Sequence, residues 1–366
     1  MSFPYPAFMQ MALRLARKGI GRTSPNPAVG AVLVRSGKVV GRGYHRAAGL
    51  PHAEVEAILD AGKAAGGADL YVTLEPCCHS GRMGPCTEAI LAAGIRRVAA
   101  AMRDPNPRVN GRGIASLRRA GLSVSVGLLE DEAGALNRPY CRWIVSGKPY
   151  VTLKMAMSLD GRIAAADGSS RWISGPKSRE MVHRMRAESD AVLVGGETFR
   201  KDDPLLTSRI RGGRDPKRVI LTSRFSSVSG KRLFREGKGE VIFVCPESLS
   251  VRDAERGASL GGKVIRLPAR RGTIPAEAFL RALGKESVTS LLVEGGSRTA
   301  GWLVAAGAVD RFVFFSAPLL LGEGVPALTG YRAQTVSDGR KLAITEIRRV
   351  GNDLMVTAEP VERTKR

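Results

Sequence analysis

Apolar side chains in the first part of the chain recur with helical and strand periods, which predicts a regular alternation of helices and strands. In residues 6–19 they fall three or four positions apart after Pro6, so that one face of a helix is apolar. Residues 28–44 form two extended apolar runs around Ser36–Gly37, as expected for two strands joined by a turn. Further helices are predicted at 52–67, 87–94 and 113–121, and further strands at 68–76, 95–102 and 122–127.

The second half repeats the alternation with longer apolar strands. Strands are predicted at 150–163, 190–196, 217–223, 240–245, 263–267, 288–296 and 310–322, and helices at 178–189, 275–285 and 299–307. Residues 341–360 predict a hairpin that turns at 351–353. Gly and Pro interrupt the pattern in 145–150, so we divide the chain into domains at 1–146 and 149–366. Both are α/β, and the alternation in the first predicts helices on both faces of one sheet.

Composition and cysteine usage indicate a soluble intracellular protein. The chain has 366 residues, of which 43% are hydrophobic and 25% charged, which is ordinary for globular proteins. Its start lacks the order of residues found in secretory signal peptides, and no apolar run approaches the length of a membrane span. Five cysteines are too few, and odd in number, for a disulfide scaffold, so we expect a cytoplasmic protein.

The net charge of +23 raises the possibility of a nucleic-acid partner. The excess is spread evenly, however, with +9 in residues 1–146 and +14 in the remainder. Aromatic residues make up only 5% and do not accompany the basic run at 209–218, as a platform for single strands would require. We therefore expect a solvated, arginine-rich surface suited to phosphorylated small molecules, with neither nucleic acid nor membrane as partner.

Residues 74–86 hold three of the five cysteines, and His52 and Glu54 precede them. His-x-Glu followed by Pro-Cys and a later Cys is the signature of zinc-dependent deaminases, in which the glutamate carries protons and does not bind the metal. The signature makes His52, Cys77 and Cys86 the zinc ligands, since Cys77 follows Pro76. Side chains two residues apart point about 200° apart on a helix, at about 100° per residue. His52 and Glu54 can therefore face the same metal site only if that site lies at the first turn of the helix. The alternative is a closed structural site with Cys78 or His79 as fourth ligand, which would leave Glu54 without a role.

No Gly-x-Gly-x-x-Gly follows a strand in the second half. The segment 291–307 offers an apolar strand, Glu294, a Gly-Gly turn and a helix whose first amides could hold a pyrophosphate. By itself, a strand joined to a helix by a Gly-Gly turn more often serves only to connect the two elements than to bind a ligand.

In four segments, 24–34, 51–58, 71–86 and 102–113, the chain resembles the deaminase half of the bifunctional deaminase/reductase family of riboflavin biosynthesis. Segments 151–175, 184–209 and 293–303 resemble the reductase half of the same family. The resemblance implies a cytidine-deaminase-like three-layer α/β/α domain followed by a dihydrofolate-reductase-like α/β domain. This chain has Cys78 where the family has Ser and Met83–Gly84 where it has Thr–Pro, and it is unusually basic after Arg209.

The resemblance also implies a reaction sequence and an assembly. Zinc-dependent deamination of 2,5-diamino-6-(5-phosphoribosylamino)pyrimidin-4(3H)-one is followed by NADPH-dependent reduction to 5-amino-6-(5-phosphoribitylamino)uracil. The family is commonly homo-oligomeric. Eight residues separate Cys77 from Cys86, whereas tRNA-adenosine deaminases have two. This spacing and the even charge argue against the main alternative, a nucleic-acid base deaminase with an accessory α/β domain. A zinc-stabilised nucleotide-sensing module is a third reading.

Family motifs assign the remaining candidate residues. Those facing the deaminase substrate are Asn26, His45 and His79. Those lining NADPH are Ala156, Trp172, Thr198, Asp202, Ser223, Gly296, Ser297, Arg298, Thr299, Ala300, Gly301 and Trp302. Those facing the reductase substrate are Ser170, Arg186, Leu206, Arg209 and Glu294, with the arginines on its phosphate.

Several of these assignments compete with simpler structural roles. Asn26, between two prolines, could be a turn former, and His45 a strand-end histidine bonded to the backbone. We add Arg224, beside Ser223, for the adenosine 2′-phosphate. Lys154 and Asp202 are candidates for protonation or orientation in the reductase, or else a surface ion pair. Trp172 could equally be a core aromatic.

Overall fold

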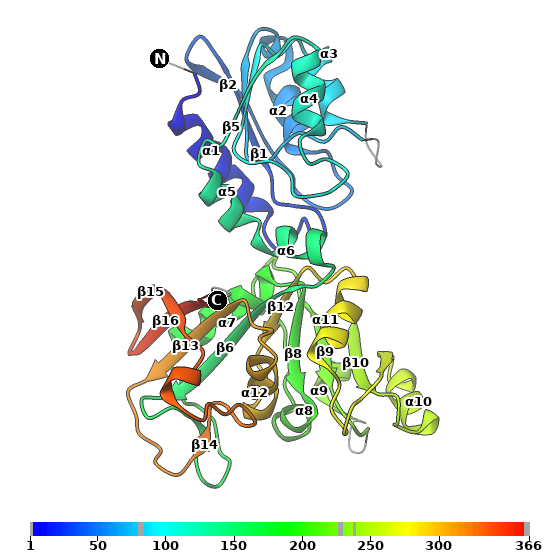
Figure 1. Cartoon of the computed structure of the whole chain (residues 1–366), viewed down its shortest axis with the longest axis vertical. Helices are drawn as coiled ribbons and strands as arrows, with labels where there is room; N and C mark the ends of the chain where they lie inside the picture. The colour runs from blue at the N-terminus through cyan, green and yellow to red at the C-terminus, as the bar shows by residue number, and fades with distance from the viewer. Residues whose placement is uncertain (1–2, 80–83, 226–229, 237–238, 362–366) are drawn as a thin grey trace. The chain divides into compact units, whose positions relative to one another are not determined.

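A computed structural model describes residues 3–79, 84–225, 230–236 and 239–361 (Figure 1). The chain divides into two compact units, Met1–Lys148 and Pro149–Arg366. Met83, one of the departures from the family loop, lies outside the described residues. None of the helices in the described ranges has the length and apolar character needed to cross a membrane.

The first unit is built on a five-stranded sheet in the order β2-β1-β3-β4-β5. β1 pairs antiparallel with β2 and β3, while β3, β4 and β5 are parallel. The strands are β1 Gly30–Arg35, β2 Lys38–Tyr44, β3 Asp69–Val72, β4 Arg97–Ala100 and β5 Ser123–Val126. The α-helices are α1 Pro6–Ala16, α2 Ala53–Ala61, α3 Cys86–Ala92, α4 Arg112–Arg119, α5 Glu130–Leu136 and α6 Arg138–Ser146.

Alternating side chains of β1 build the two apolar layers of this unit. Ala31 and Leu33 point to the face covered by α2, α3 and α4. Val32 and Val34 point to the opposite face, which α1 and α5 cover. The expected three-layer α/β/α arrangement is therefore confirmed (Figure 1).

One close approach brings α2 onto the edge strand β2. A β-carbon on Gly43 would lie 2.2 Å from the carbonyl oxygen of Ala53, so only glycine permits this contact. Ala53 is the first residue of α2, and His52 is its N-cap. The glycine thus fixes where the start of α2 lies relative to the sheet.

The second unit contains a nine-stranded sheet in the order β11-β10-β9-β8-β12-β6-β13-β16-β15. Neighbours are parallel from β11 to β13, and β16 and β15 extend the sheet antiparallel. The strands are β6 Tyr150–Ser158, β8 Ala191–Gly195, β9 Lys217–Leu221, β10 Val241–Pro246, β11 Lys263–Leu267, β12 Ser290–Val293, β13 Arg311–Ala317, β15 Leu342–Val350 and β16 Asp353–Pro360. The short strands β7 Arg162–Ala164 and β14 Val325–Pro326 pair separately.

Helices cover both faces of this sheet. α11 and α12 pack on the face that receives Leu193, and α8 and α9 pack on the face that receives Val192. The helices are α7 Pro176–Glu188, α8 Gly196–Asp202, α9 Arg232–Arg235, α10 Val251–Ser259, α11 Ala276–Lys285 and α12 Ser297–Ala305. The pattern analysis predicted α7, α11 and α12 but missed α8, α9 and α10, as it missed α5 and α6 in the first unit.

Candidate active sites

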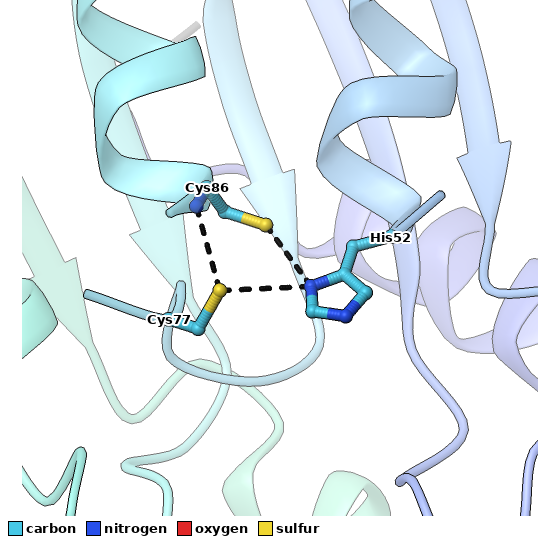
Figure 2. Close-up of side chains that lie close together, drawn as sticks. All are labelled: His52, Cys77 and Cys86. Carbon is cyan, nitrogen blue, oxygen red and sulfur yellow. Dashed lines mark hydrogen bonds between the residues drawn. The ribbon is translucent and has the colours of Figure 1, made fainter. Parts of the chain in front are cut away.

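Three side chains from separate segments of the first unit converge in a group that could hold a metal ion (Figure 2). His52 Nδ1 lies 3.2 Å from Cys86 Sγ and 3.6 Å from Cys77 Sγ. For zinc bonded to sulfur at about 2.3 Å and nitrogen at about 2.05 Å, the N···S edge of a tetrahedron is about 3.5 Å. The spacing and the donor set therefore fit zinc.

The same group argues against a closed structural site. Among the described residues it contains three ligands, and neither Cys78 nor His79 belongs to it. Cys78 is half-buried and His79 is exposed. Three protein ligands leave one position of a tetrahedral ion for water, as in catalytic zinc sites.

Local structure places two of the ligands at helix starts and the third in a loop. His52 caps α2, Cys86 opens α3, and Cys77 lies in the irregular segment that follows β3. The Cys86 amide donates to Cys77 Sγ at 3.4 Å, and the Thr87 amide donates to the Cys77 carbonyl at 3.2 Å. These bonds hold the two cysteines together across eight intervening residues.

Glu75 is a supporting residue that sequence reasoning missed. Its buried carboxylate accepts hydrogen bonds from the amides of Asp104, Gly111 and Ile114, at 3.2, 2.8 and 3.1 Å. It thereby anchors the segment between β3 and Cys77 onto the start of α4 and the loop before it. An acidic residue directly after a mostly apolar run was the available signal.

The two thiols differ in acidity. A hydrogen bond from Cys86, assisted by His52, lowers the pKa of Cys77. The same bond, together with burial, raises the pKa of Cys86. Zinc binds thiolates, so its binding would favour loss of the proton from Cys86 as well.

Glu54 lies in the first turn of α2, as its spacing from His52 required. Its side chain is 3% exposed. Burial, and then the charge of Cys77, raises the pKa of Glu54 to about 7. The carboxyl is a hydrogen-bond partner of Cys86 but is not one of the three clustered ligands. A buried carboxyl that titrates near neutrality is suited to accepting and returning a proton.

Asn26 and His45 lie together beside the ligands, and the structural role expected for each is seen. Asn26 forms a turn through its amide, which donates to the Thr23 carbonyl at 2.9 Å, and its side chain contacts His45. His45 follows β2 and bonds to the backbone carbonyl of Pro51, and its ring centroid is 5.2 Å from that of His52. Burial lowers the pKa of His45.

In the second unit, three of the candidate side chains form a buried ionic group. Arg186 on α7 donates to both carboxylate oxygens of Glu294, at 2.5 and 3.0 Å, and to the Thr207 carbonyl at 3.1 Å. Lys154 Nζ on β6 lies 3.8 Å from Glu294. Lys154 is therefore buried against Glu294, and its alternative as half of a surface pair with Asp202 is wrong.

The Gly-Gly turn after β12 forms a narrow cradle at the start of α12. A β-carbon on Gly296 would lie 3.1 Å from Thr198 Oγ1, and one on Gly295 would lie 2.9 Å from Thr299 Cβ. This close approach of backbone and hydroxyls fits the pyrophosphate of a dinucleotide. Ser297 at the start of α12 is hydrogen-bonded to Thr329.

The later residues of α12 face inward. Ala300 is fully buried in the core, and the backbone of Thr329 packs directly on Gly301. The Trp302 indole donates to the Ile274 carbonyl at 3.1 Å. These side chains thus belong to the packing of the helix, whereas Gly296, Ser297, Arg298 and Thr299 form its first turn.

Ser170 and Asp202 line one cavity of about 460 Å³ next to the segment that carries Trp172. Trp172 is 68% exposed, so the expectation of a core aromatic is wrong. The Arg179 guanidinium lies 4.5 Å from the centre of its ring. Ala156 lies on β6, half-buried against α7.

Ser223 and Arg224 are exposed just beyond β9. Thr222 Oγ1 joins this segment to α8, because it donates to the Arg224 carbonyl at 2.8 Å and accepts from Arg200 at 3.3 Å. Burial and the charge of Arg224 lower the pKa of Arg200. Sequence reasoning missed Arg200, whose only signal was its place in a helix that was not predicted.

Leu206 and Arg209 lie on the loop after α8, both with positive φ, 56° and 53°. The Leu206 side chain is buried in the core, so its backbone alone can face a ligand, whereas Arg209 is exposed.

Two family models match the chain. Residues 5–102 match the cytidine and deoxycytidylate deaminase zinc-binding region, and residues 149–356 match the RibD C-terminal domain. The two matches lie one in each of the compact units, and they confirm the expected fold classes.

Relatives with the same order of domains are similar over nearly the whole chain. The riboflavin biosynthesis protein RibD of Aquifex aeolicus is 41% identical over 351 residues, which cover 95% of this chain and 96% of the relative. Acinetobacter baumannii RibD, whose structure is known, is 35% identical in sequence. The match covers 98% of this chain and 99% of that protein, with a TM-score of 0.88. A diaminohydroxyphosphoribosylaminopyrimidine deaminase/5-amino-6-(5-phosphoribosylamino)uracil reductase from Thermotoga maritima is 37% identical, with the same coverage and a TM-score of 0.86.

Proposed function

The chain belongs to the RibD family, whose members are bifunctional deaminase/reductases of riboflavin biosynthesis, and from this membership we propose how its residues divide the work. The protein is an enzyme that uses zinc and NADPH. Residues 1–146 deaminate 2,5-diamino-6-(5-phosphoribosylamino)pyrimidin-4(3H)-one. Residues 149–366 then reduce the ribosyl group to give 5-amino-6-(5-phosphoribitylamino)uracil. Similarity over the whole chain favours this reading over a nucleic-acid base deaminase.

The convergence of His52, Cys77 and Cys86 carries the deaminase assignment. These residues would hold the zinc ion, which when bound supplies Lewis-acid activation of water. Glu54 takes a proton from the attacking water on its carboxylate and delivers a proton to the departing amine, so that water enters and ammonia leaves. Burial raises the pKa of this carboxyl above its ordinary value, which favours its acting both as acceptor and as donor of a proton near neutral pH. Asn26 and His79 face the pyrimidine, and His45 lies behind Asn26, to which it is hydrogen-bonded.

In the reductase, bound NADPH supplies a hydride for the anomeric carbon. Gly296, Ser297, Arg298 and Thr299 would hold its pyrophosphate, and the other cofactor contacts would be Ala156, Trp172, Thr198, Asp202, Ser223, Arg200 and Arg224. Ala300, Gly301 and Trp302 would support this site through the packing of α12. The ring oxygen of the sugar gains a proton when the ring opens. Lys154 is positioned for this role because burial lowers its pKa while Glu294 holds its ammonium group in place.

The reductase substrate occupies the remaining candidate residues, Ser170, Arg186, Leu206, Arg209 and Glu294. Arginine suits the ribose phosphate because its fork binds phosphate oxygens in pairs. We further propose a homo-oligomeric, cytoplasmic enzyme whose partner is this phosphorylated pyrimidine.

The test follows ammonia release and then NADPH consumption by the full-length protein with the diaminopyrimidine nucleotide. Glu54→Gln should keep the zinc content but lower ammonia release by about 10²–10⁴-fold, and it should still consume NADPH when given the deaminated product. Glu56→Gln, on the same helix and paired with the exposed Arg46, is the matched control and should deaminate normally. Loss of zinc in Glu54→Gln, or deamination equal to that of the control, would contradict the assigned role.

A further inference from the structure

Asn26 and His45 form a hydrogen-bonded pair whose geometry determines which atom of the amide is available to a ligand. His45 Nε2 lies 3.2 Å from Asn26 Nδ2, and His45 Nδ1 lies 3.1 Å from the Pro51 carbonyl oxygen. The His45 side chain is only 2% exposed, whereas Asn26 is half-buried. His45 is therefore a buried link between the backbone just before the ligand His52 and an amide that a substrate can reach.

The Pro51 carbonyl fixes the tautomer of His45. A carbonyl oxygen can only accept, so Nδ1 of the imidazole carries the hydrogen and donates it. Nε2 then has the lone pair and accepts from the amide nitrogen of Asn26. In this chain of bonds the Asn26 amide nitrogen donates to His45 Nε2, and His45 Nδ1 donates to the Pro51 carbonyl.

This chain of bonds leaves the carbonyl oxygen of Asn26 unused. Within the described part of the chain no hydrogen bond uses Asn26 Oδ1. The backbone of Asn26 is held by the flanking prolines and by the bond of its amide to the Thr23 carbonyl. Only a rotation of the side-chain amide could exchange oxygen for nitrogen, and His45 opposes that rotation because its lone pair would then meet an oxygen.

We propose that His45 is a positioning residue that holds Asn26 with its oxygen toward the pyrimidine, which makes the deaminase selective for substrates with a ring N–H beside the reacting carbon. The proposal rests on the function proposed above. In a 2-amino-4(3H)-pyrimidinone, N3–H is next to the carbon that bears the amine, and it can donate to Asn26. In a cytosine nucleotide the ring nitrogen next to the amine carbon is an acceptor, which would face the Asn26 oxygen without a proton between them.

The test compares the cost of His45→Phe in two backgrounds of the full-length enzyme. In the wild-type background the phenylalanine frees the amide to rotate, and we expect kcat/KM for deamination to fall about tenfold. In the Asn26→Ala background there is no side-chain amide left to orient. There, His45→Phe should change kcat/KM less than about twofold.

Controls separate positioning from damage to the fold or to the zinc site. Zinc content and NADPH consumption with the deaminated product should stay at wild-type levels in each variant, and Tyr44→Phe, at the end of the same strand, should deaminate normally. If His45→Phe loses zinc, His45→Gln takes its place in the comparison.

Equal losses in both backgrounds would mean that His45 contacts the substrate itself and would overturn the proposal, as would an unchanged kcat/KM in the wild-type background. A wild-type protein that releases no ammonia would instead contradict the proposed function.

Discussion

Glu294→Gln removes one negative charge from the interior of the second unit and leaves two cations behind. The Glu294 side chain is 8% exposed, Arg186 is 13% exposed and Lys154 is 14% exposed. The carboxylate accepts two bonds from Arg186, at 2.5 and 3.0 Å. Glutamine keeps the shape of the side chain but offers a single neutral acceptor, so the guanidinium would remain buried without a counter-charge.

Removing one partner of a buried ion pair costs about 3–5 kcal/mol. For a domain of roughly 150–250 residues, 1 kcal/mol corresponds to about 2–4 °C in Tm, so the transition of the second unit should fall by about 6–20 °C. Glu180→Gln is the matched control, because Glu180 pairs with Arg184 on the same helix as Arg186 but both are 64% exposed. An exposed pair contributes about 0.3–0.5 kcal/mol, which predicts a shift below about 2 °C.

Calorimetry of the full-length protein measures both shifts, and the reasoning fails if Glu294→Gln lowers Tm no more than Glu180→Gln does. The double variant Arg186→Met with Glu294→Leu should regain part of the loss, because the uncompensated guanidinium is gone while Lys154 remains without its counter-charge.

The same ion pair predicts a pH dependence. Burial alone would raise the pKa of Glu294, but Arg186 and Lys154 outweigh it and bring the pKa below its ordinary value. Because the folded pKa is depressed, the stabilisation is complete above the ordinary value of 4.5 and is lost as pH falls through the folded value. The Tm of the second unit, measured as a function of pH, should therefore be higher in wild type than in Glu294→Gln by a constant amount near neutrality. This difference in Tm should shrink only in acid.

Two further predictions concern the zinc loop and the cofactor. Gly113→Ala would place a methyl group 2.0 Å from the Pro76 carbonyl oxygen, so we expect about 1–3 kcal/mol of destabilisation and weaker zinc binding. Gly134→Ala, which meets no described atom within 4 Å, should be neutral or stabilising, and normal zinc affinity in Gly113→Ala would contradict the packing argument. Replacing Arg200 and Arg224 together by alanine should raise KM for NADPH at least about tenfold and leave KM for NADH unchanged, because only NADPH carries the 2′-phosphate. Equal losses with both cofactors would refute that assignment.

Strands and long amphipathic helices could be predicted because burial imposes a period on the sequence. In β1 the alternation of Ala31 and Leu33 with Val32 and Val34 serves two apolar layers at once. Of the missed helices, α8 with seven residues and α9 with four are too short to show a clear period. α8 starts at Gly196, directly after β8, so its glycines look like the end of a strand. α10 contains Gly257, whose missing side chain makes room for Phe225, a contact that only the tertiary structure supplies.

The two sites differ in how much of them the sequence reveals. The zinc ligands occur at characteristic spacings, because His52 and Cys86 lie at two helix starts and the Cys86 amide binds the Cys77 sulfur in the loop after β3. In the reductase, Arg186 and Glu294 are far apart in sequence and meet across the sheet. Each was expected to face substrate, but nothing in either segment indicated that they face one another. The shape of the cradle at Gly296 likewise depends on Thr198, which belongs to another element.

Glu54 and Glu294 show how one residue type acquires two chemistries in this enzyme. Both carboxyls are buried, and burial by itself raises the pKa of each. In the metal-free site the charge next to Glu54 is the thiolate of Cys77, which adds to the effect of burial and brings the pKa to about 7. Next to Glu294 the charges are Arg186 and Lys154, which reverse it. The first environment produces a group that exchanges protons at neutral pH, and the second a permanent anion that holds two cations in fixed positions. Interchanging the neighbours, and not the glutamates, would interchange the roles.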